Sequence, residues 1–405
     1  MKAVVFHAIG DIRLDDVPEP KIEQPTDAVI RLTASAICGT DLHMVRGSFA
    51  GMEKGTILGH EGVGVVEAVG SQVRNFAPGD RVVVCSTIAC GHCSYCRSGY
   101  YAQCDTANPH GKRAGTAFFG GPGPTGPWNG LQAEKARIPY AHTTLVKVPD
   151  AVSDDQAILV SDIFPTGWFG ADMAEIDGSH TVAVFGCGPV GQFAIASARL
   201  MGAGRIIAVD HHPDRLEMAR RQGAEVVDFG KEDPVETILD LTGGIGVDRA
   251  IDAVGVDAEH HHHATPTSLV DKASGVLHAA AAAVKPGAQS HDHAWTKGDA
   301  PSQALDWAVA ALAKAGTLSI IGVYPPTMNT FPIGAAMNKN LTLRMGNCHH
   351  RRYIPHLLDL IASGTIDPVN ILTVVEPMQD AISAYEAFDD RKPGWMKVEL
   401  KPKAA

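Results

Sequence analysis

The stretch AICGTDLHMVRG, residues 36–47, places a thiol, a hydroxyl, a carboxylate and an imidazole within six positions. These four side chains belong to Cys38, Thr40, Asp41 and His43. Such groups are costly to bury together unless an ion or a substrate engages them. The pair His60 and Glu61 follows 22 residues after the cysteine and adds a second ligand of a type that zinc prefers.

A third candidate ligand, Asp162, lies in the apolar stretch LVSDIFPTGWFG. Two interpretations of this residue are open on the residues alone. An aspartate before an apolar run is a common helix N-cap. A buried carboxylate is also expensive without a cation, so the same residue is a candidate metal ligand.

Four of the eight cysteines form the cluster CGHCSYCRSGYYAQC, with the spacing C-x2-C-x2-C-x7-C. They are Cys90, Cys93, Cys96 and Cys104. Two-residue gaps let neighbouring thiolates converge on one ion, and a closed shell of four leaves no position for substrate. The spacing therefore predicts a structural zinc site. Redox or disulfide cysteines and an iron–sulfur cluster are the less favoured alternatives.

The stretch VFGCGPVG carries a G-x-G-x-x-G motif made by Gly186, Gly188 and Gly191, with Pro189 and Val190 inside it. The motif alone is weak. Here it follows a predicted strand and opens a predicted helix, and Asp210 comes nineteen residues later at the end of the next strand. This context favours a dinucleotide over a glycine-rich turn of another α/β protein. Because Asp210 can bind the ribose hydroxyls and would repel a 2′-phosphate, we expect NAD.

The elements that position these groups fall into two parts. The first 150 residues read as short strands and turns, such as AVIRLTASAIC and GVGVVEAVG, with a Gly/Pro-rich loop over residues 110–130. From about residue 165, buried strands alternate with helical patterns (HTVAVFG, PVGQFAIASARLMGA, RIIAVD, RLEMARRQGA, AEVVDF), which predicts an α/β fold with a doubly wound parallel sheet. A helix is expected at YIPHLLDLIASG.

Size and charge narrow the class of protein. The chain has 405 residues, 45% hydrophobic and 20% charged, and a net charge of -11. This composition suits about two globular domains and disfavours nucleic acid or an anionic membrane as the main partner. No signal peptide or apolar run of about 20 residues is apparent, so we expect a cytoplasmic protein whose clustered cysteines bind metal.

The segment 257–300 is unusually long for a connection inside such a sheet. It contains the run His260–His263 followed by an alanine-rich tract. We interpret it as a surface insertion; a lid over the site and a third metal site are the alternatives.

Taken together, CGTDLH, GHEGVGVV, PGDRV, the four-cysteine loop and GCGPVG resemble the zinc-dependent alcohol dehydrogenases of the medium-chain dehydrogenase/reductase family. The stretch SDIFPTG is most similar to the branch that contains glutathione-independent formaldehyde dehydrogenase, whose third zinc ligand is an aspartate. The resemblance therefore favours Asp162 as a ligand. It implies a GroES-like catalytic domain (residues 1–163 and 348–405) and a Rossmann NAD-binding domain (164–347).

The resemblance also implies a role for each candidate. Catalytic zinc would be held by Cys38, His60 and Asp162, and structural zinc by the four clustered cysteines. Glu61 would lie beside the metal and Asp41 would orient His60. Thr40 would hydrogen-bond the substrate oxygen, His43 would pass its proton onward, and Arg215 would contact the adenosine ribose.

The expected activity is reversible transfer of a hydride between an alcohol and NAD, in a homo-oligomer (dimer or tetramer) acting on a small-molecule alcohol or aldehyde. One alternative is a formaldehyde dehydrogenase or aldehyde dismutase that retains its NAD. A non-catalytic NAD-binding protein is disfavoured, because a binding module needs no proton relay. Phe118, Phe119 and Trp128 either line an apolar substrate pocket or pack their own loop.

Overall fold

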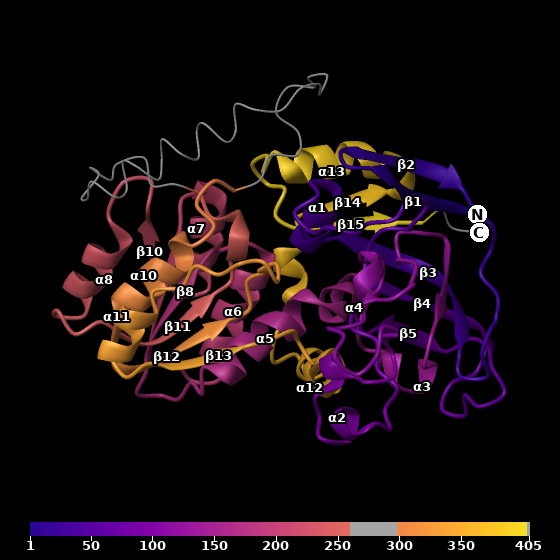
Figure 1. The fold of residues 1–405 in the computed structure, drawn as a ribbon, viewed down its shortest axis with the longest axis horizontal. Coiled ribbons are helices and arrows are strands. Elements are labelled where there is room, and N and C mark those ends of the chain that lie inside the picture. Colours follow the sequence, from indigo (N-terminus) through magenta and orange to yellow (C-terminus); the bar gives the residue numbers. More distant parts are fainter. Residues whose placement is uncertain (260–297, 403–405) are drawn as a thin grey trace.

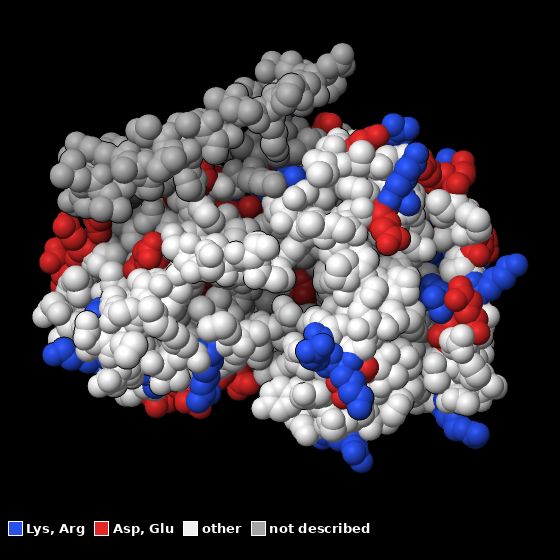
Figure 2. All heavy atoms as spheres, viewed as in Figure 1, with Lys and Arg blue, Asp and Glu red and all other residues white. Residues whose placement is uncertain are grey.

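The computed structural model describes residues 1–259 and 298–402, which form two halves that each contain a sheet (Figure 1). The predicted segment 257–300, with its histidine run, lies largely outside the described residues. No helix among the described residues is long and apolar enough to cross a membrane. On the face drawn in Figure 2, basic and acidic side chains are interspersed, and the surface is hollowed between the halves.

The first half contains a largely antiparallel sheet with the strand order β14-β15-β3-β4-β5-β7, and β6 also pairs with β3. Its strands are β3 (Ala28–Ile37), β4 (Gly62–Val69), β5 (Arg81–Val84), β6 (Lys135–Ile138), β7 (Leu145–Lys147), β14 (Val374–Pro377) and β15 (Val398–Lys401). A separate ribbon pairs β1 (Lys2–Ala8) with β2 (Asp11–Asp16). The chain's last strand, β15, thus lies directly beside β3.

The first half also contains short helices, most of only one or two turns. They are α1 (Gly39–Val45), α2 (Ser94–Arg97), α3 (Ala141–Thr144) and α13 (Ala381–Asp389). The Gly/Pro-rich segment 110–130 is loop as predicted, apart from one 3₁₀ turn at Gly123–Thr125.

The second half is a six-stranded parallel sheet with the order β10-β9-β8-β11-β12-β13. Its strands are β8 (Thr181–Phe185), β9 (Arg205–Asp210), β10 (Glu225–Asp228), β11 (Val247–Asp252), β12 (Leu312–Ile320) and β13 (Thr342–Met345), and its helices are α6 (Pro189–Leu200), α7 (Pro213–Arg221), α8 (Pro234–Leu241), α10 (Gln303–Ala311) and α11 (Ile333–Asn338). The order reverses between β8 and β11, where ligands of such sheets bind. The predicted α/β fold class is confirmed.

Three helices join the halves: α4 (Asp154–Ser161), α5 (Ile163–Met173) and α12 (His350–Ala362). Side chains from all three share one core cluster, including Leu159, Phe164 and Leu357. α12 begins at His350, three residues before the predicted start of this helix at Tyr353. This difference matters, because it places a histidine at the start of a helix that packs against α5.

Candidate active site

Cys38 lies at the point where β3 ends and α1 begins. Its backbone N–H donates to the Asp41 carboxylate at 2.9 Å, which fixes the first turn of α1. Its thiol is buried, and burial raises the pKa of that thiol. The local geometry therefore places the sulfur of Cys38 among the groups that line the cavity between the halves.

His60, just before β4, has one ring nitrogen on each side of this arrangement. Nδ1 lies 3.0 Å from Asp41 Oδ1, and Nε2 lies 3.3 Å from Asp162 Oδ2. Phe118 meets the ring edge-on at 6.3 Å between centroids. The contact with Asp41 orients the imidazole so that Nε2 faces the other candidate ligands.

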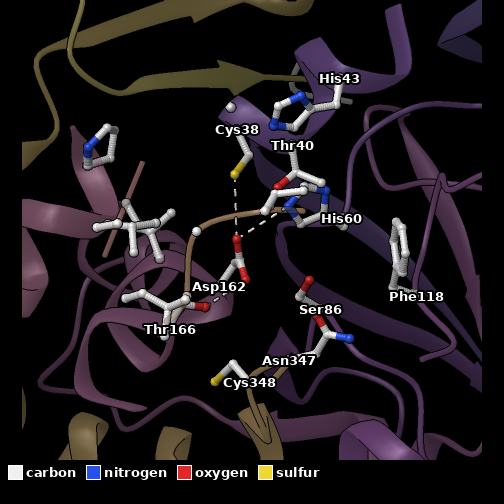
Figure 3. Close-up of a pocket in the computed structure, with 18 of the residues that line it drawn as sticks. Cys38, Thr40, His43, His60, Ser86, Phe118, Asp162, Thr166, Asn347 and Cys348 are labelled. Carbon is white, nitrogen blue, oxygen red and sulfur yellow. Dashed lines mark hydrogen bonds and ion pairs between the residues drawn. The ribbon is translucent and has the colours of Figure 1, made fainter. Parts of the chain in front are cut away.

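Asp162 stands at the break between α4 and α5, with φ −142° and ψ −65°. It occupies the N-cap position of α5, as one of the two interpretations held, but its side chain does not cap the helix. Instead Oδ2 turns towards Cys38 Sγ at 3.6 Å and His60 Nε2 at 3.3 Å (Figure 3). Because its carboxylate does not cap α5, Asp162 directs that group into the cavity.

These three side chains fit a zinc ion. With zinc–ligand distances of about 2.3 Å for sulfur and about 2.0–2.2 Å for nitrogen and oxygen, a tetrahedral shell separates sulfur from oxygen by about 3.6 Å and nitrogen from oxygen by about 3.3–3.4 Å. The spacings in this site are 3.6 and 3.3 Å. Glu61 has a ligand atom within 4.8 Å of the other three. The chemistry of the donors and their spacing both match zinc.

Thr40 and His43, on α1, line the same cavity as Cys38 (Figure 3). His43 is buried, and its Nδ1 lies 3.8 Å from Oδ1 of Asp257, which belongs to the second half. The cavity is also lined by Gly188 and Val190 of the glycine motif. The predicted proton-handling residues and the nucleotide loop therefore face one space.

The three aromatic residues divide between the two interpretations. Phe118 lines the cavity. Phe119 is buried in the core of the first half. Trp128 packs against that core and donates its indole N–H to the Ala107 carbonyl at 3.1 Å. Neither Phe119 nor Trp128 lines the cavity that contains Cys38.

Glu61 is buried beside the candidate metal ligands and is paired with Lys397, a residue that the sequence reasoning missed. Both side chains have no exposed surface. The Lys397 ammonium donates to Glu61 and to the Ile37 carbonyl, the latter at 3.0 Å. Burial raises the pKa of Glu61, and the ammonium opposes that shift. The lysine thereby supplies a countercharge within the wall of the cavity.

His350 is the second residue that the sequence reasoning missed. Its Nε2 lies 2.7 Å from Asp162 Oδ1. Burial by itself would raise the pKa of Asp162, but hydrogen bonds with His350 and His60 outweigh burial and hold that pKa well below its usual range. No spacing in the sequence links these residues, because 188 positions separate them.

The four clustered cysteines converge on a separate site in the first half. The sulfurs of Cys90 and Cys96, and those of Cys93 and Cys104, are 4.0 Å apart, close to the spacing of about 3.8 Å in a tetrahedral thiolate shell. A hydrogen bond from the Cys96 thiol, together with backbone amides, lowers the pKa of Cys104 to about 4. The cluster suits one zinc ion and lies outside the residues that line the cavity.

The three glycines of the nucleotide motif lie in three different backbone surroundings. Gly186 has φ +86°, a conformation that favours glycine. A Cβ at Gly191 would lie 1.8 Å from the Gly186 carbonyl oxygen, so this residue must be glycine for α6 to pack against the turn. At Gly188, by contrast, a Cβ would meet only Arg215, at 3.8 Å. That open position, at the start of α6, lets a ligand approach the backbone.

Asp210 is the last residue of β9 and faces a second cavity, which adjoins the glycine motif. Its carboxylate accepts backbone N–H groups from Cys187, His211 and His212 at 2.7–2.9 Å. Nη1 of Arg215 lies 4.0 Å from Asp210 Oδ2. Part of the glycine motif, Asp210 and Arg215 therefore line one cavity.

The fold and the site define a nucleotide-binding dehydrogenase with metal sites, and the comparisons agree. Residues 24–150 match the alcohol dehydrogenase GroES-like domain, and residues 189–262 match the zinc-binding dehydrogenase family. A zinc-type alcohol dehydrogenase-like protein of Bacillus subtilis (strain 168) is 38% identical over 99% of this chain and all of its own length.

Two further proteins are similar to this chain along nearly its whole length. Glutathione-independent formaldehyde dehydrogenase of Pseudomonas aeruginosa is 35% identical, over 96% of this chain and 94% of its own. The structure of the alcohol dehydrogenase TADH from Thermus sp. ATN1 aligns with a TM-score of 0.79 and 32% identity over the full length of both chains. The chain belongs to the zinc-type alcohol dehydrogenases of the medium-chain dehydrogenase/reductase family, and is an oxidoreductase.

Proposed function

We propose that this protein oxidises an alcohol with NAD, and reduces the corresponding aldehyde or ketone, using zinc held by Cys38, His60 and Asp162. The observation that carries the proposal is the tetrahedral spacing of these three ligands in a cavity that Gly188 and Val190 also line. A zinc ion held there would act as a Lewis acid and ease loss of the proton from the substrate hydroxyl.

The chain's own residues then handle the proton and the substrate. Thr40 accepts the hydrogen bond of the substrate hydroxyl. As it takes that proton it gives up its own hydroxyl proton, which His43 carries away from the cavity, while the hydride leaves the substrate carbon for NAD. Asp41 keeps the His60 ring in place, and Phe118 supplies apolar surface for the carbon chain of the alcohol. Asp210 holds the adenosine ribose of NAD beside Arg215. The four-cysteine cluster holds the structural zinc and stabilises its loop.

A panel of primary and secondary alcohols, assayed for NADH absorbance with NAD and with NADP, tests this proposal. We expect turnover with NAD, weaker use of NADP, and loss of activity with a strong zinc chelator. Activity that survives complete removal of zinc would refute it.

A second candidate function rests on the 35% identity to glutathione-independent formaldehyde dehydrogenase. In that case the purified protein would carry NAD and would convert formaldehyde without added cofactor. Denaturing the protein and measuring released NAD separates the two functions, because an ordinary alcohol dehydrogenase releases its cofactor during purification.

Assembly into a dimer or tetramer is part of the proposal, as is a cytoplasmic location. β13 is an edge strand of the parallel sheet, and exposed apolar side chains lie on it and on α11: Ile333, Met337 and Met345. Edge strands with apolar surface are frequent contact sites. Light scattering coupled to gel filtration measures the assembly, and Met345→Lys should weaken it.

A further inference from the structure

The two carboxylate oxygens of Asp162 face different partners. Oδ2 is directed at Cys38 and His60, as described above. Oδ1 accepts hydrogen bonds from His350 Nε2 at 2.7 Å and from the Thr166 hydroxyl at 3.2 Å. Because rotation about the Cβ–Cγ bond would exchange the two oxygens, the contacts on Oδ1 decide which oxygen the metal site receives.

His350 is itself held at both ring nitrogens. The ring is buried, and its Nδ1 lies 3.1 Å from the Thr87 hydroxyl. When the Thr87 hydroxyl donates to Nδ1 rather than to the Cys348 carbonyl oxygen 3.4 Å away, Nε2 carries the hydrogen that Asp162 accepts, so the neutral ring satisfies both contacts. Thr87 follows β5 and His350 begins α12, so two elements distant in sequence fix the ring.

His60 and Asp162 are each held by a side chain that is not itself a proposed metal ligand. His60 is an imidazole oriented by the Asp41 carboxylate at 3.0 Å. Asp162 is a carboxylate oriented by the His350 imidazole at 2.7 Å. Groups hydrogen-bonded to metal ligands commonly change metal affinity by about 10–100-fold when they are removed.

We propose that His350 is a positioning residue for the catalytic metal: its Nε2–H holds Asp162 Oδ1 and thereby presents Oδ2 to the ion. This inference rests on the proposed function, because it requires Asp162 to be a metal ligand. In this role His350 acts through Asp162, although its side chain also lines the cavity. Thr166 provides a second, weaker contact to the same oxygen, so loss of His350 weakens the site without abolishing it.

Two conservative variants isolate the hydrogen bond. In His350→Gln the side-chain amide reaches the former Nε2 position and can still donate to Asp162. In His350→Asn the amide reaches only the Nδ1 position, near Thr87. His349→Asn is the matched control, because His349 is an adjacent buried histidine that instead accepts the Ala102 backbone N–H at 3.3 Å.

The measurement is zinc retained per chain after dialysis against a graded series of chelator concentrations, with thermal unfolding recorded for each variant. We expect His350→Asn to lose one zinc at about 10–100-fold lower chelator than the wild type. His350→Gln and His349→Asn should stay close to the wild type. Equal retention by all variants, or equal loss in the Asn and Gln variants, would overturn the proposal.

Cys38→Ala separates this inference from the function on which it rests. If the wild type and Cys38→Ala retain the same amount of zinc, the catalytic metal site itself is wrong. If Cys38→Ala lacks one zinc while His350→Asn matches the wild type, the metal site stands and the positioning role fails. Cobalt substitution gives a second readout, since a change in the ligand field alters the visible absorption of the bound cobalt.

Discussion

The two cysteine-containing sites of this protein are built in opposite ways. The four-cysteine cluster draws its ligands from one segment of fifteen residues. The cavity site has its proposed ligands at positions 38, 60 and 162, and its supporting side chains at positions 350 and 397. A local site needs only its loop, whereas a distributed site needs the whole fold to be correct. We therefore expect loss of the four-cysteine site to lower the stability of its loop, and loss of the cavity site to lower catalytic activity.

Cys38→Ala should produce the largest effect, and it should fall on activity. Loss of the sulfur ligand removes Lewis-acid stabilisation worth several kcal/mol, so kcat/KM for alcohol oxidation should fall by about 10³-fold or more. Steady-state kinetics and zinc content per chain measure this. Cys85→Ala is the control, because Cys85 is equally buried but belongs to neither site. Near-normal turnover by Cys38→Ala would show that the cavity site does not depend on this sulfur for catalysis.

Cys104→Ser should reverse the pattern and act on stability. The cluster pins a loop with little core of its own, so losing its metal should lower the free energy of unfolding by about 4 kcal/mol. Chemical denaturation and limited proteolysis near residues 90–104 report this change. The fraction that stays folded should keep its turnover per catalytic zinc. A variant as stable as the wild type would contradict a structural role.

The contrast between a local site and a distributed site also explains which residues could be predicted from the sequence. The cysteine cluster, the glycine motif and Asp210 follow from spacing, because their partners are near in the chain. Asp162 was ambiguous on spacing, and only a family resemblance favoured it as a ligand. His350 and Lys397 carry no local signal, because the groups they contact lie 188 and 336 residues away. Such partners become visible only once α12 and β15 are placed beside the site.

Lys397→Met tests whether the distributed site is held by buried charge. Removal of one partner leaves Glu61 buried without a countercharge, which should cost about 3 kcal/mol of folding free energy. The double variant Glu61→Gln/Lys397→Met should recover most of this loss, because no unpaired charge remains. Urea unfolding of the two single variants and the double variant completes the cycle. Additive losses would show that the pair is not coupled.

Glu399, two residues from Lys397, should give the smallest effect. It is fully buried, and within the described chain neither carboxylate oxygen has a hydrogen-bond partner, although Lys401 lies 3.6 Å away. Burial raises its pKa from 4.5 to about 7. The folded state therefore binds the extra proton, so this group lowers the free energy of unfolding as pH rises from about 4.5 to about 7.

Glu399→Gln removes that titration. At pH 8 the variant should be more stable than the wild type by about 1–3 kcal/mol, and at pH 4.5 or below the two should be similar. Thermal or urea unfolding at both pH values measures the difference. A difference that does not change with pH would show that folding leaves the pKa of Glu399 unshifted.

The pairing of Lys397 with Glu61 also means that folding of the first half needs the last part of the chain to be synthesised. The acid is synthesised 336 residues before the amine that neutralises it. Chains generally fold from the N-terminus during synthesis. Here, however, the first sheet is incomplete until β15 emerges and pairs between β14 and β3. A nascent chain arrested before residue 397 would expose an unneutralised acid and an open sheet edge, which is a natural substrate for chaperones.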